Sequence, residues 1–260
     1  MSTATSRDGT PIAYERQGSG PAVILATGAL DDGSENGPLA AELASHFTTY
    51  NYSRRGRGES GDTQPYALVR EIEDLAALIA EAGGSAHLYG VSSGGALIME
   101  AAAAGLAVGK LAVYEVPYMI GEQAVQGWRQ YVGQLEAALA EGRRGEAGEL
   151  FMRLAGSPEE QIAAARNSPH WPGVEALAHT LAYDAACLGD GEPPTERLAT
   201  ISQPTLVATG GGNDFFESAA DAIAASLPNG QRLTLTGQVH VVDPKAMASE
   251  LRRFFGADHA

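Results

Sequence analysis

A strand-like run at residues 86–89 passes into a helix-like run at 96–104 through the pentapeptide Gly-Val-Ser-Ser-Gly at 90–94. So sharp a turn forces its central residue, Ser92, into a strained backbone, and glycines two positions away on either side let strand and helix approach closely. The Ser92 hydroxyl is then exposed at the start of the helix, where backbone N–H groups favour negative charge. A chain with 32 glycines could contain the pentapeptide by chance. Its place between a strand and a helix is what predicts Ser92 as a catalytic nucleophile.

Apolar bursts followed by a turn and a helical pattern recur on either side of this segment. The predicted strands are 12–16, 22–26, 47–52, 86–89, 111–116, 205–209 and 232–236. The predicted helices between them are 38–46, 65–82, 96–104, 219–226 and 244–255. Within 65–82 the apolar residues recur at helical spacing, and Glu71, Glu73 and Asp74 fall on the opposite face. This alternation predicts an α/β fold with a mostly parallel sheet covered by helices on both faces.

The alternation is interrupted between residues 117 and 199, where the pattern is almost wholly helical. We therefore predict a core formed by 1–116 and 200–260, with 117–199 inserted as a helical cap over the carboxyl edge of the sheet. Aromatic and other large side chains supply the bulk of this insertion. Among them, Tyr118, Met119 and Trp171 are predicted to face a substrate pocket.

Charge and cysteine content exclude several classes of partner. The formal net charge is -15, so a nucleic-acid backbone or an anionic lipid surface would be repelled. Cys187 is the only cysteine, which excludes an internal disulfide and favours a reducing compartment. The chain has no apolar segment before Ala22 and no run long enough to span a bilayer. We expect a cytoplasmic protein with a small-molecule substrate, and its oligomeric state stays open.

A serine in such a turn needs a histidine and an acid, which follow it along the chain in the order serine, acid, histidine. His240 follows the predicted strand 232–236 in a loop that can reach over the sheet edge. The remaining histidines fit a structural role better: His46, His87, His170, His179 and His259.

Two acids compete for the third position. Asp214 follows strand 205–209 through a glycine-rich turn and has the usual place in the chain order. Glu115 ends strand 111–116, in an apolar stretch where a carboxylate needs a partner to be tolerated. The chain order favours Asp214 slightly, and the local chemistry favours Glu115.

The negative charge that develops during attack on a carbonyl also needs hydrogen-bond donors. One backbone N–H would come from Ser93, the residue after the nucleophile, and one from the loop after strand 22–26. In that loop, Thr27-Gly28-Ala29, Ala29 is the natural donor. We predict the Ala29 and Ser93 amides as the oxyanion hole.

With these pieces in place, the chain resembles the α/β-hydrolase superfamily over essentially its whole length. The resemblance is carried by segments 6–14, 53–62, 90–95, 114–118 and 238–240, in that order. The chain departs from the superfamily at Thr27-Gly28, where members usually have His-Gly, and in the spacing ahead of Asp214.

The resemblance implies the α/β-hydrolase fold with a helical cap and a serine hydrolase acting on an ester, thioester or lactone. Epoxide hydrolases and haloalkane dehalogenases share the scaffold but use aspartate as nucleophile, so Ser92 argues against both. The alternatives are non-hydrolytic chemistry on the same scaffold, namely carbon–carbon cleavage, acyl transfer, perhydrolysis or cyclisation, and a ligand-binding sensor that keeps the triad.

One further motif points to a cofactor and fails on geometry. Residues 56–61 match G-x-G-x-x-G after a strand, but Gln64-Pro65 separates the last glycine from the next helix. The neighbouring Arg54, Arg55 and Arg57 are better explained as neutralising nearby acids than as a phosphate site. No metal-binding pattern is present, and we expect neither a metal nor a cofactor.

Overall fold

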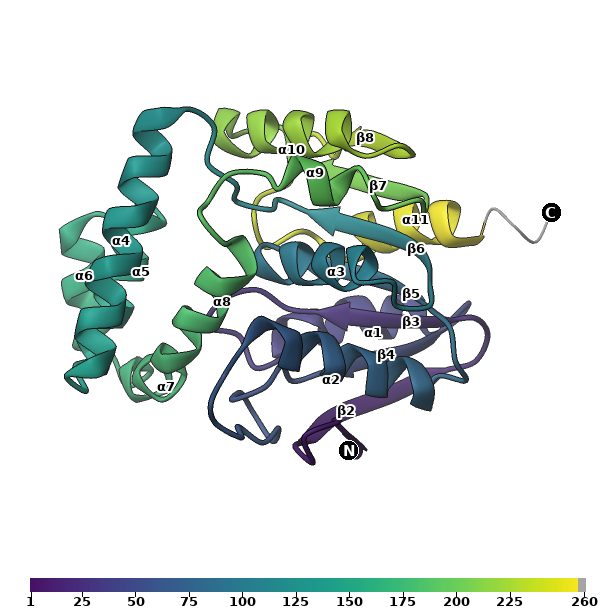
Figure 1. The fold of residues 1–260 in the computed structure, drawn as a ribbon, viewed down its shortest axis with the longest axis horizontal. Coiled ribbons are helices and arrows are strands. Elements are labelled where there is room, and N and C mark those ends of the chain that lie inside the picture. The colour runs from purple at the N-terminus through teal and green to yellow at the C-terminus, as the bar shows by residue number, and fades with distance from the viewer. Residues whose placement is uncertain (257–260) are drawn as a thin grey trace.

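The computed structural model describes residues 1–256 and contains one eight-stranded sheet (Figure 1). Its strand order is β1-β2-β4-β3-β5-β6-β7-β8. Strand β2 is antiparallel to both of its neighbours, β1 and β4, and the remaining pairs, which involve β3 to β8, are parallel. The strands are β1 (Ser2–Thr5), β2 (Pro11–Gly18), β3 (Ala22–Ala26), β4 (Thr48–Tyr52), β5 (Ala86–Val91), β6 (Val108–Tyr114), β7 (Thr205–Thr209) and β8 (Gly230–Thr234). The predicted mostly parallel sheet is confirmed.

Successive residues of the central strands point to opposite faces of the sheet and create two apolar cores. In β3, Ile24 joins one core and Leu25 the other, and in β5 Leu88 and Tyr89 divide in the same way. Because both faces are buried, β3 is apolar throughout and β5 is apolar except at His87.

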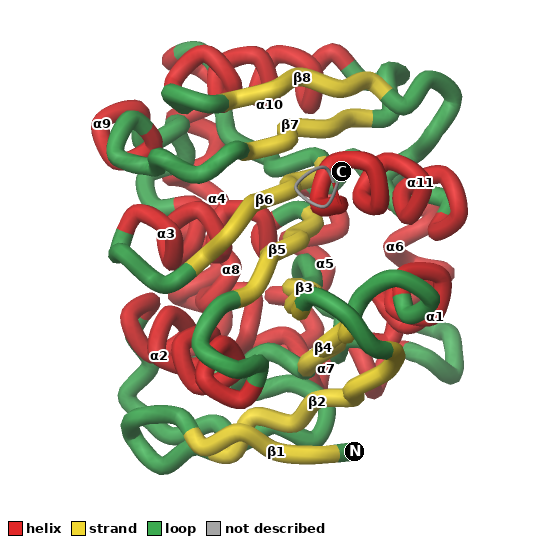
Figure 2. The backbone as a smooth tube through the Cα atoms, turned by 90° about the vertical axis from the view of Figure 1, so that its right-hand side faces the viewer, coloured by secondary structure: helices red, strands yellow, loops and turns green. Residues whose placement is uncertain are grey.

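Helices from both halves of the chain cover the two cores (Figure 2). On one face lie α2 (Leu68–Glu81), α3 (Ser93–Ala103) and α10 (Asp214–Ser226), and on the other α1 (Gly37–Leu43) and α11 (Pro244–Phe255). A short 3-10 helix, η1 (Ser34–Asn36), precedes α1. The predicted three-layer arrangement therefore forms with small shifts at element ends.

The acidic residues of α2 differ from the predicted pattern. Glu71 and Asp74 are each 1% exposed, because they form ion pairs with Arg54 and Arg55, which are also buried. The prediction that the three arginines neutralise nearby acids is confirmed by these pairs and by the pair between Arg57 and Asp184.

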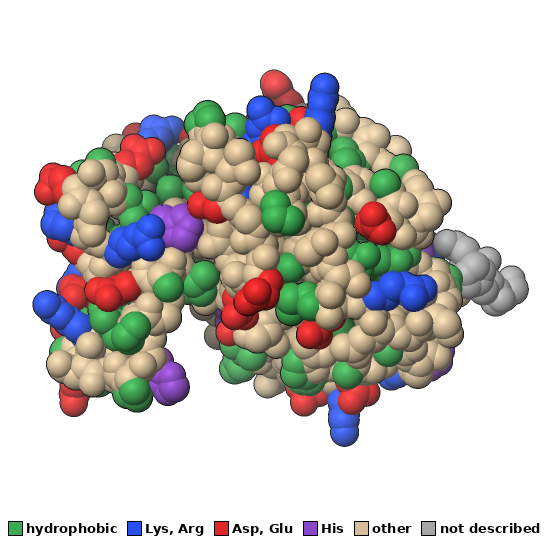
Figure 3. All heavy atoms as spheres, turned by 90° about the horizontal axis from the view of Figure 1, so that it is seen from below, with side chains coloured by type: hydrophobic (Ala, Val, Ile, Leu, Met, Phe, Trp, Pro, Cys, Tyr) green, Lys and Arg blue, Asp and Glu red, His purple; other side chains and the backbone are tan. Residues whose placement is uncertain are grey.

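The segment between β6 and β7 contains the expected run of helices. They are α4 (Glu122–Ala140), α5 (Arg144–Leu154), α6 (Glu159–Arg166), α7 (Trp171–Leu177), η2 (Ala178–Thr180), α8 (Leu181–Leu188) and α9 (Thr195–Leu198). Figure 1 shows α4 to α8 beyond the end of the sheet toward which the β3 and β6 arrows point. Helix α8 packs against α3, and a notch is visible between the inserted helices and the rest of the molecule in Figure 3.

Two short elements have no signal in the sequence pattern. In β1 only Ala4 is buried, so the strand lacks an apolar alternation, and α9 is four residues long. The predicted core extended to residue 260, and residues 257–260, with His259, lie outside the described residues. None of the helices in the described part of the chain combines the length and apolar character needed to cross a bilayer.

Candidate active site

Backbone strain is concentrated at the carboxyl end of the sheet. Within residues 1–256, the non-glycine residues with positive φ are Leu30, Ser92 and Glu115, at 55°, 55° and 47°. Each follows a central parallel strand, namely β3, β5 or β6. Such conformations cost about 1–3 kcal/mol each and persist where the surrounding structure enforces them, which is typical of functional sites.

Ser92 occupies the sharp turn between β5 and α3 that the sequence predicts. Its φ of 55° and ψ of -129° place it outside helical and extended conformations. Its N–H donates to the Tyr114 carbonyl at 2.9 Å, which fixes the turn beside the end of β6. Ser92 is partly exposed at the N-terminus of α3, so its hydroxyl can be reached by a substrate.

The glycines on either side permit this turn. A Cβ added at Gly90 would lie 2.5 Å from the Gly94 carbonyl oxygen, and one added at Gly94 would lie 2.5 Å from the Thr27 carbonyl oxygen. Both contacts are with backbone atoms, which cannot rotate away.

We expect Gly94→Ala to destabilise the fold by roughly 1–3 kcal/mol, because the added methyl group pushes α3 away from the loop after β3. Gly133→Ala is the matched control: Gly133 is exposed in α4 with no atom within 4 Å of an added Cβ. It should gain about 0.5–1 kcal/mol from helix propensity. Urea unfolding measures both changes, and equal stabilities would contradict the close packing of the turn.

Glu115 and His240 are brought together at the same edge of the sheet. Glu115 is 4% exposed, and its Oε2 lies 2.8 Å from His240 Nδ1. Its Oε1 accepts a hydrogen bond from the Gly210 N–H at 3.0 Å. Because a carboxylate only accepts hydrogen bonds, His240 donates from Nδ1 and leaves Nε2 free to accept a proton.

The surroundings of His240 hold its ring in place. Phe216 of α10 stacks on the imidazole with 5.0 Å between ring centroids. Burial, and then the charge of Asp31, raises the pKa of Glu35, while the charge of His240 opposes that shift. His240 is therefore held by Glu115 at the end of β6 and by Phe216 of α10.

Asp214 is not brought to His240. It is an exposed residue in the first turn of α10, and within the described residues its side chain forms no hydrogen bond or ion pair. The glycine-rich turn before Asp214 does not direct that residue to His240; instead, its Gly210 amide donates a hydrogen bond to Glu115. The slight preference for Asp214, which came from chain order, is therefore not supported by this geometry.

Ser92 and His240 are not hydrogen-bonded to each other within residues 1–256. The His240 side chain is 44% exposed in the loop after β8. Catalytic hydrogen bonds in ligand-free enzymes are often long and tighten when substrate binds. The carboxyl edge of the sheet thus holds a serine, a histidine and a carboxylate, and the His240 ring is already oriented by Glu115.

The loop after β3 lies directly against Ser92. A Cβ added at Gly28 would be 3.0 Å from the Ser92 Cβ, so the backbone there is packed against Ser92. The amides of Ala29 and Ser93, the two predicted oxyanion donors, bind no protein acceptor within the described part of the chain. Asp31 closes this loop, because it accepts hydrogen bonds from the Thr27 hydroxyl and the Gly33 amide.

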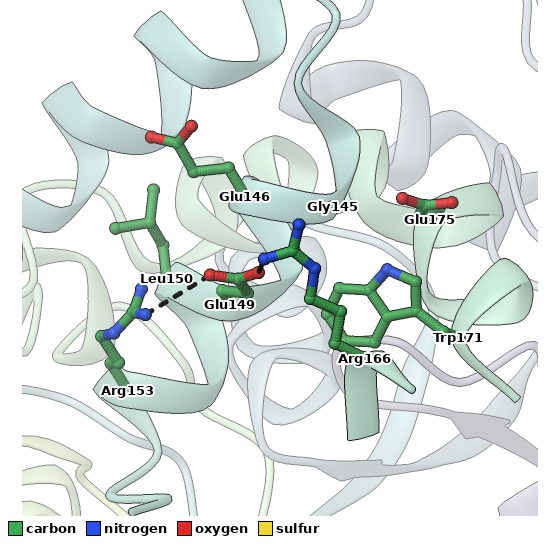
Figure 4. A pocket seen from close by; sticks show the side chains of 8 residues that line it. All are labelled: Gly145, Glu146, Glu149, Leu150, Arg153, Arg166, Trp171 and Glu175. Carbon is green, nitrogen blue, oxygen red and sulfur yellow. Dashed lines mark hydrogen bonds and ion pairs between the residues drawn. The ribbon is translucent and has the colours of Figure 1, made fainter. Parts of the chain in front are cut away.

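The three predicted pocket residues lie in different environments. Tyr118 is 1% exposed, and burial raises the pKa of its hydroxyl. Met119 is also buried, and its amide binds the Gly191 carbonyl at 2.8 Å. Trp171 lines a hollow of about 370 Å³ whose residues all belong to the inserted helices, beside the Glu149 ion pairs with Arg153 and Arg166 (Figure 4). That hollow contains no residue of the Ser92 turn.

Across residues 1–256, no three histidine, cysteine or carboxylate side chains converge in a way that could hold a metal ion. Sequence reasoning missed the stacking of Phe216 on His240 and the burial of the acids that pair with the arginines. The signal for Phe216 was its place after the glycine-rich turn that leads from β7 into α10.

Comparison with known proteins agrees with this architecture. A sequence model described as the alpha/beta hydrolase family matches residues 23–251. An α/β hydrolase from Sphaerobacter thermophilus is 49% identical, with a TM-score of 0.88 over 97% of this chain and 99% of that chain. A hydrolase from Pseudomonas aeruginosa is 25% identical, with a TM-score of 0.73 over 98% of both chains. An esterase from Thermogutta terrifontis, 22% identical, shares the fold with a TM-score of 0.71 over 99% of this chain and 98% of that chain.

Proposed function

Because this chain belongs to the α/β-hydrolase family, we propose that it is a serine hydrolase acting on a small-molecule ester, thioester or lactone. The observation that carries the proposal is the strained Ser92 turn at the same sheet edge as the hydrogen-bonded pair of Glu115 and His240. A serine hydroxyl is a weak nucleophile on its own, and an oriented imidazole activates it.

In the proposed cycle, the Ser92 Oγ attacks the carbonyl carbon while His240 Nε2 accepts the hydroxyl proton. Collapse of the tetrahedral intermediate breaks the bond to the leaving group, which receives that proton, and an acyl-enzyme remains. Water, activated by His240 in the same way, then releases the acid and regenerates Ser92. Glu115 keeps the imidazole in the required tautomer and stabilises its protonated form.

The oxyanion of each tetrahedral intermediate would accept hydrogen bonds from the Ala29 and Ser93 amides. Losing one such donor typically costs about 10²–10³ in rate. The loop after β3 is therefore expected to matter for rate almost as much as the triad.

We also propose that the inserted segment 117–199 caps the site and contributes the substrate pocket. Its helices lie beyond the carboxyl edge of the sheet, where α/β proteins bind their ligands. The cycle needs no metal or cofactor.

The test is labelling with a fluorophosphonate, followed by hydrolysis of p-nitrophenyl esters of increasing chain length. We expect stoichiometric labelling at Ser92, located by peptide mass spectrometry, and a maximum of kcat/KM at one chain length. A folded protein that is not labelled would contradict serine catalysis. Labelling with acyl transfer to an added alcohol, but no net hydrolysis, would favour a transferase over a hydrolase.

A further inference from the structure

A carboxylate from the inserted helices accepts a hydrogen bond from the residue that follows Ser92. Asp184 of α8 is 5% exposed, and its Oδ1 accepts three hydrogen bonds of 2.7 Å. The donors are the Ser93 Oγ, the Arg54 Nη1 and the Arg57 Nη2. Its other oxygen, Oδ2, is buried and has no partner within the described residues. One oxygen atom thus joins α8 to the residue after the nucleophile and to two arginines.

The same two arginines hold the carbonyls of the loop after β3. Arg54 Nη1 donates to the Thr27 carbonyl at 3.2 Å, and Arg57 Nη1 donates to the Gly28 carbonyl. A trans peptide is planar, so the carbonyl of one residue and the N–H of the next point in opposite directions. Arg57 therefore fixes the Gly28 carbonyl and aims the Ala29 N–H the opposite way.

We propose that Asp184 is a positioning residue for the oxyanion hole. It couples the position of α8 to both donors of the hole, the Ala29 and Ser93 amides. Through Arg57 it orients the Ala29 amide, and through the Ser93 hydroxyl it anchors the residue that carries the second amide. This inference rests on the proposed function, since it assigns a role within that mechanism.

The charges in this cluster balance, which keeps Asp184 ionised. Arg54 is paired with Glu71 through two hydrogen bonds of 2.7 and 2.8 Å, which leaves Arg57 to balance Asp184. Burial alone would raise the pKa of Asp184, but the charges of Arg57 and Arg54 outweigh it and hold that pKa below its usual value. Of the four charged residues, only Asp184 belongs to the insertion, so it is the charged link between α8 and the loop. The Cys187 Sγ of the same helix adds a weaker contact, accepting from Arg54 Nη2 at 3.4 Å.

A second buried ion pair provides a matched control. Arg55 binds Asp74 through contacts of 2.7 and 3.0 Å, and both residues are at most 1% exposed. Its other contacts are with Ser6, Asp8 and Thr10 near the N-terminus and with the Thr63 carbonyl. Within residues 1–256 this pair has no hydrogen bond to the loop after β3 or to Ser93. Loss of Asp74 should therefore cost stability without moving the oxyanion donors.

The experiment compares Asp184→Ala and Asp184→Asn with Asp74→Ala and Asp74→Asn, using the best p-nitrophenyl ester. We expect Asp184→Ala to lower kcat by about 10- to 100-fold, less than the loss of a whole donor, with KM held. Asp184→Asn should recover much of that loss, because its Oδ1 can still accept the three hydrogen bonds. Both Asp74 variants should keep kcat.

A second readout separates positioning from a general loss of stability. A trifluoromethyl ketone forms a hemiketal oxyanion in the hole, whereas the methyl ketone of the same chain length does not. Asp184→Ala should weaken the binding of the trifluoromethyl ketone by the same factor by which it lowers kcat. The affinity for the methyl ketone should not change. Arg57→Lys is the substitute variant in case Asp184→Ala does not fold. Lysine keeps the buried positive charge but cannot bind the Gly28 carbonyl and Asp184 with two separate nitrogens, so we expect the same effects on kcat and on ketone binding.

The proposal would be overturned if the Asp184 and Asp74 variants lost kcat equally. It would also be overturned if Asp184→Asn and Arg57→Lys both kept the wild-type kcat. A wild-type protein that is neither labelled nor active would instead reject the serine hydrolase function itself. The two failures are therefore distinguishable.

Discussion

Ser92→Ala should abolish ester turnover and fluorophosphonate labelling while leaving the fold intact. Removing the nucleophile of a serine hydrolase lowers kcat by roughly 10⁶-fold, because the histidine and the acid have nothing left to activate. Alanine keeps the Cβ and therefore the same backbone strain at φ 55°. We expect the change in unfolding free energy to be small, and urea unfolding together with active-site labelling measures both quantities.

The matched control is Ser249→Ala. Ser249 is an exposed residue of α11, and within the described residues it contributes no hydrogen bond to the site. It should be labelled and should turn over ester like the wild type. Full activity in Ser92→Ala would mean that another residue carries the nucleophile.

The elements that sequence reasoning located are those whose signal is local. Strand β3 is a continuous apolar run and β5 is interrupted only by His87, because both faces of these strands are buried. The glycines around Ser92 mark a turn that few residues can adopt. The strand β1 has no such signal, since only Ala4 is buried and its pairing with β2 is fixed by the rest of the sheet.

The acids of α2 show the limit of periodicity. Glu71 and Asp74 were placed on the face opposite the apolar residues, and that prediction is wrong, because both lie on the buried face of α2 beside Leu75 and Leu78. Their partners, Arg54 and Arg55, come from a loop after β4 that only the tertiary fold brings over the helix. A pattern within one helix contains no information about a charged loop that will cover it.

The same distinction applies to the candidate site. Ser92 and His240 stand next to recognisable turns, whereas the choice between Asp214 and Glu115 depends on which strand end faces the histidine. Glu115 has the apolar surroundings that require a partner, and the Gly210 amide from the next strand supplies one of its hydrogen bonds. That contact spans 95 residues of sequence, and chain order alone cannot show it.

Comparing Glu115→Gln with Asp214→Asn should identify the acid, and we expect the first to lower kcat by about 10⁴-fold with KM held. Glutamine can still accept from the Gly210 amide, but its NH₂ group then faces His240 Nδ1. The imidazole must accept at Nδ1 and carry its proton on Nε2, so it can no longer take a proton from Ser92. Asp214→Asn changes an exposed charge in the first turn of α10 and should keep kcat, at a stability cost of about 0.3–1 kcal/mol. If Asp214→Asn collapses kcat while Glu115→Gln does not, His240 must leave Glu115 during turnover. If neither does, the proposed triad is wrong.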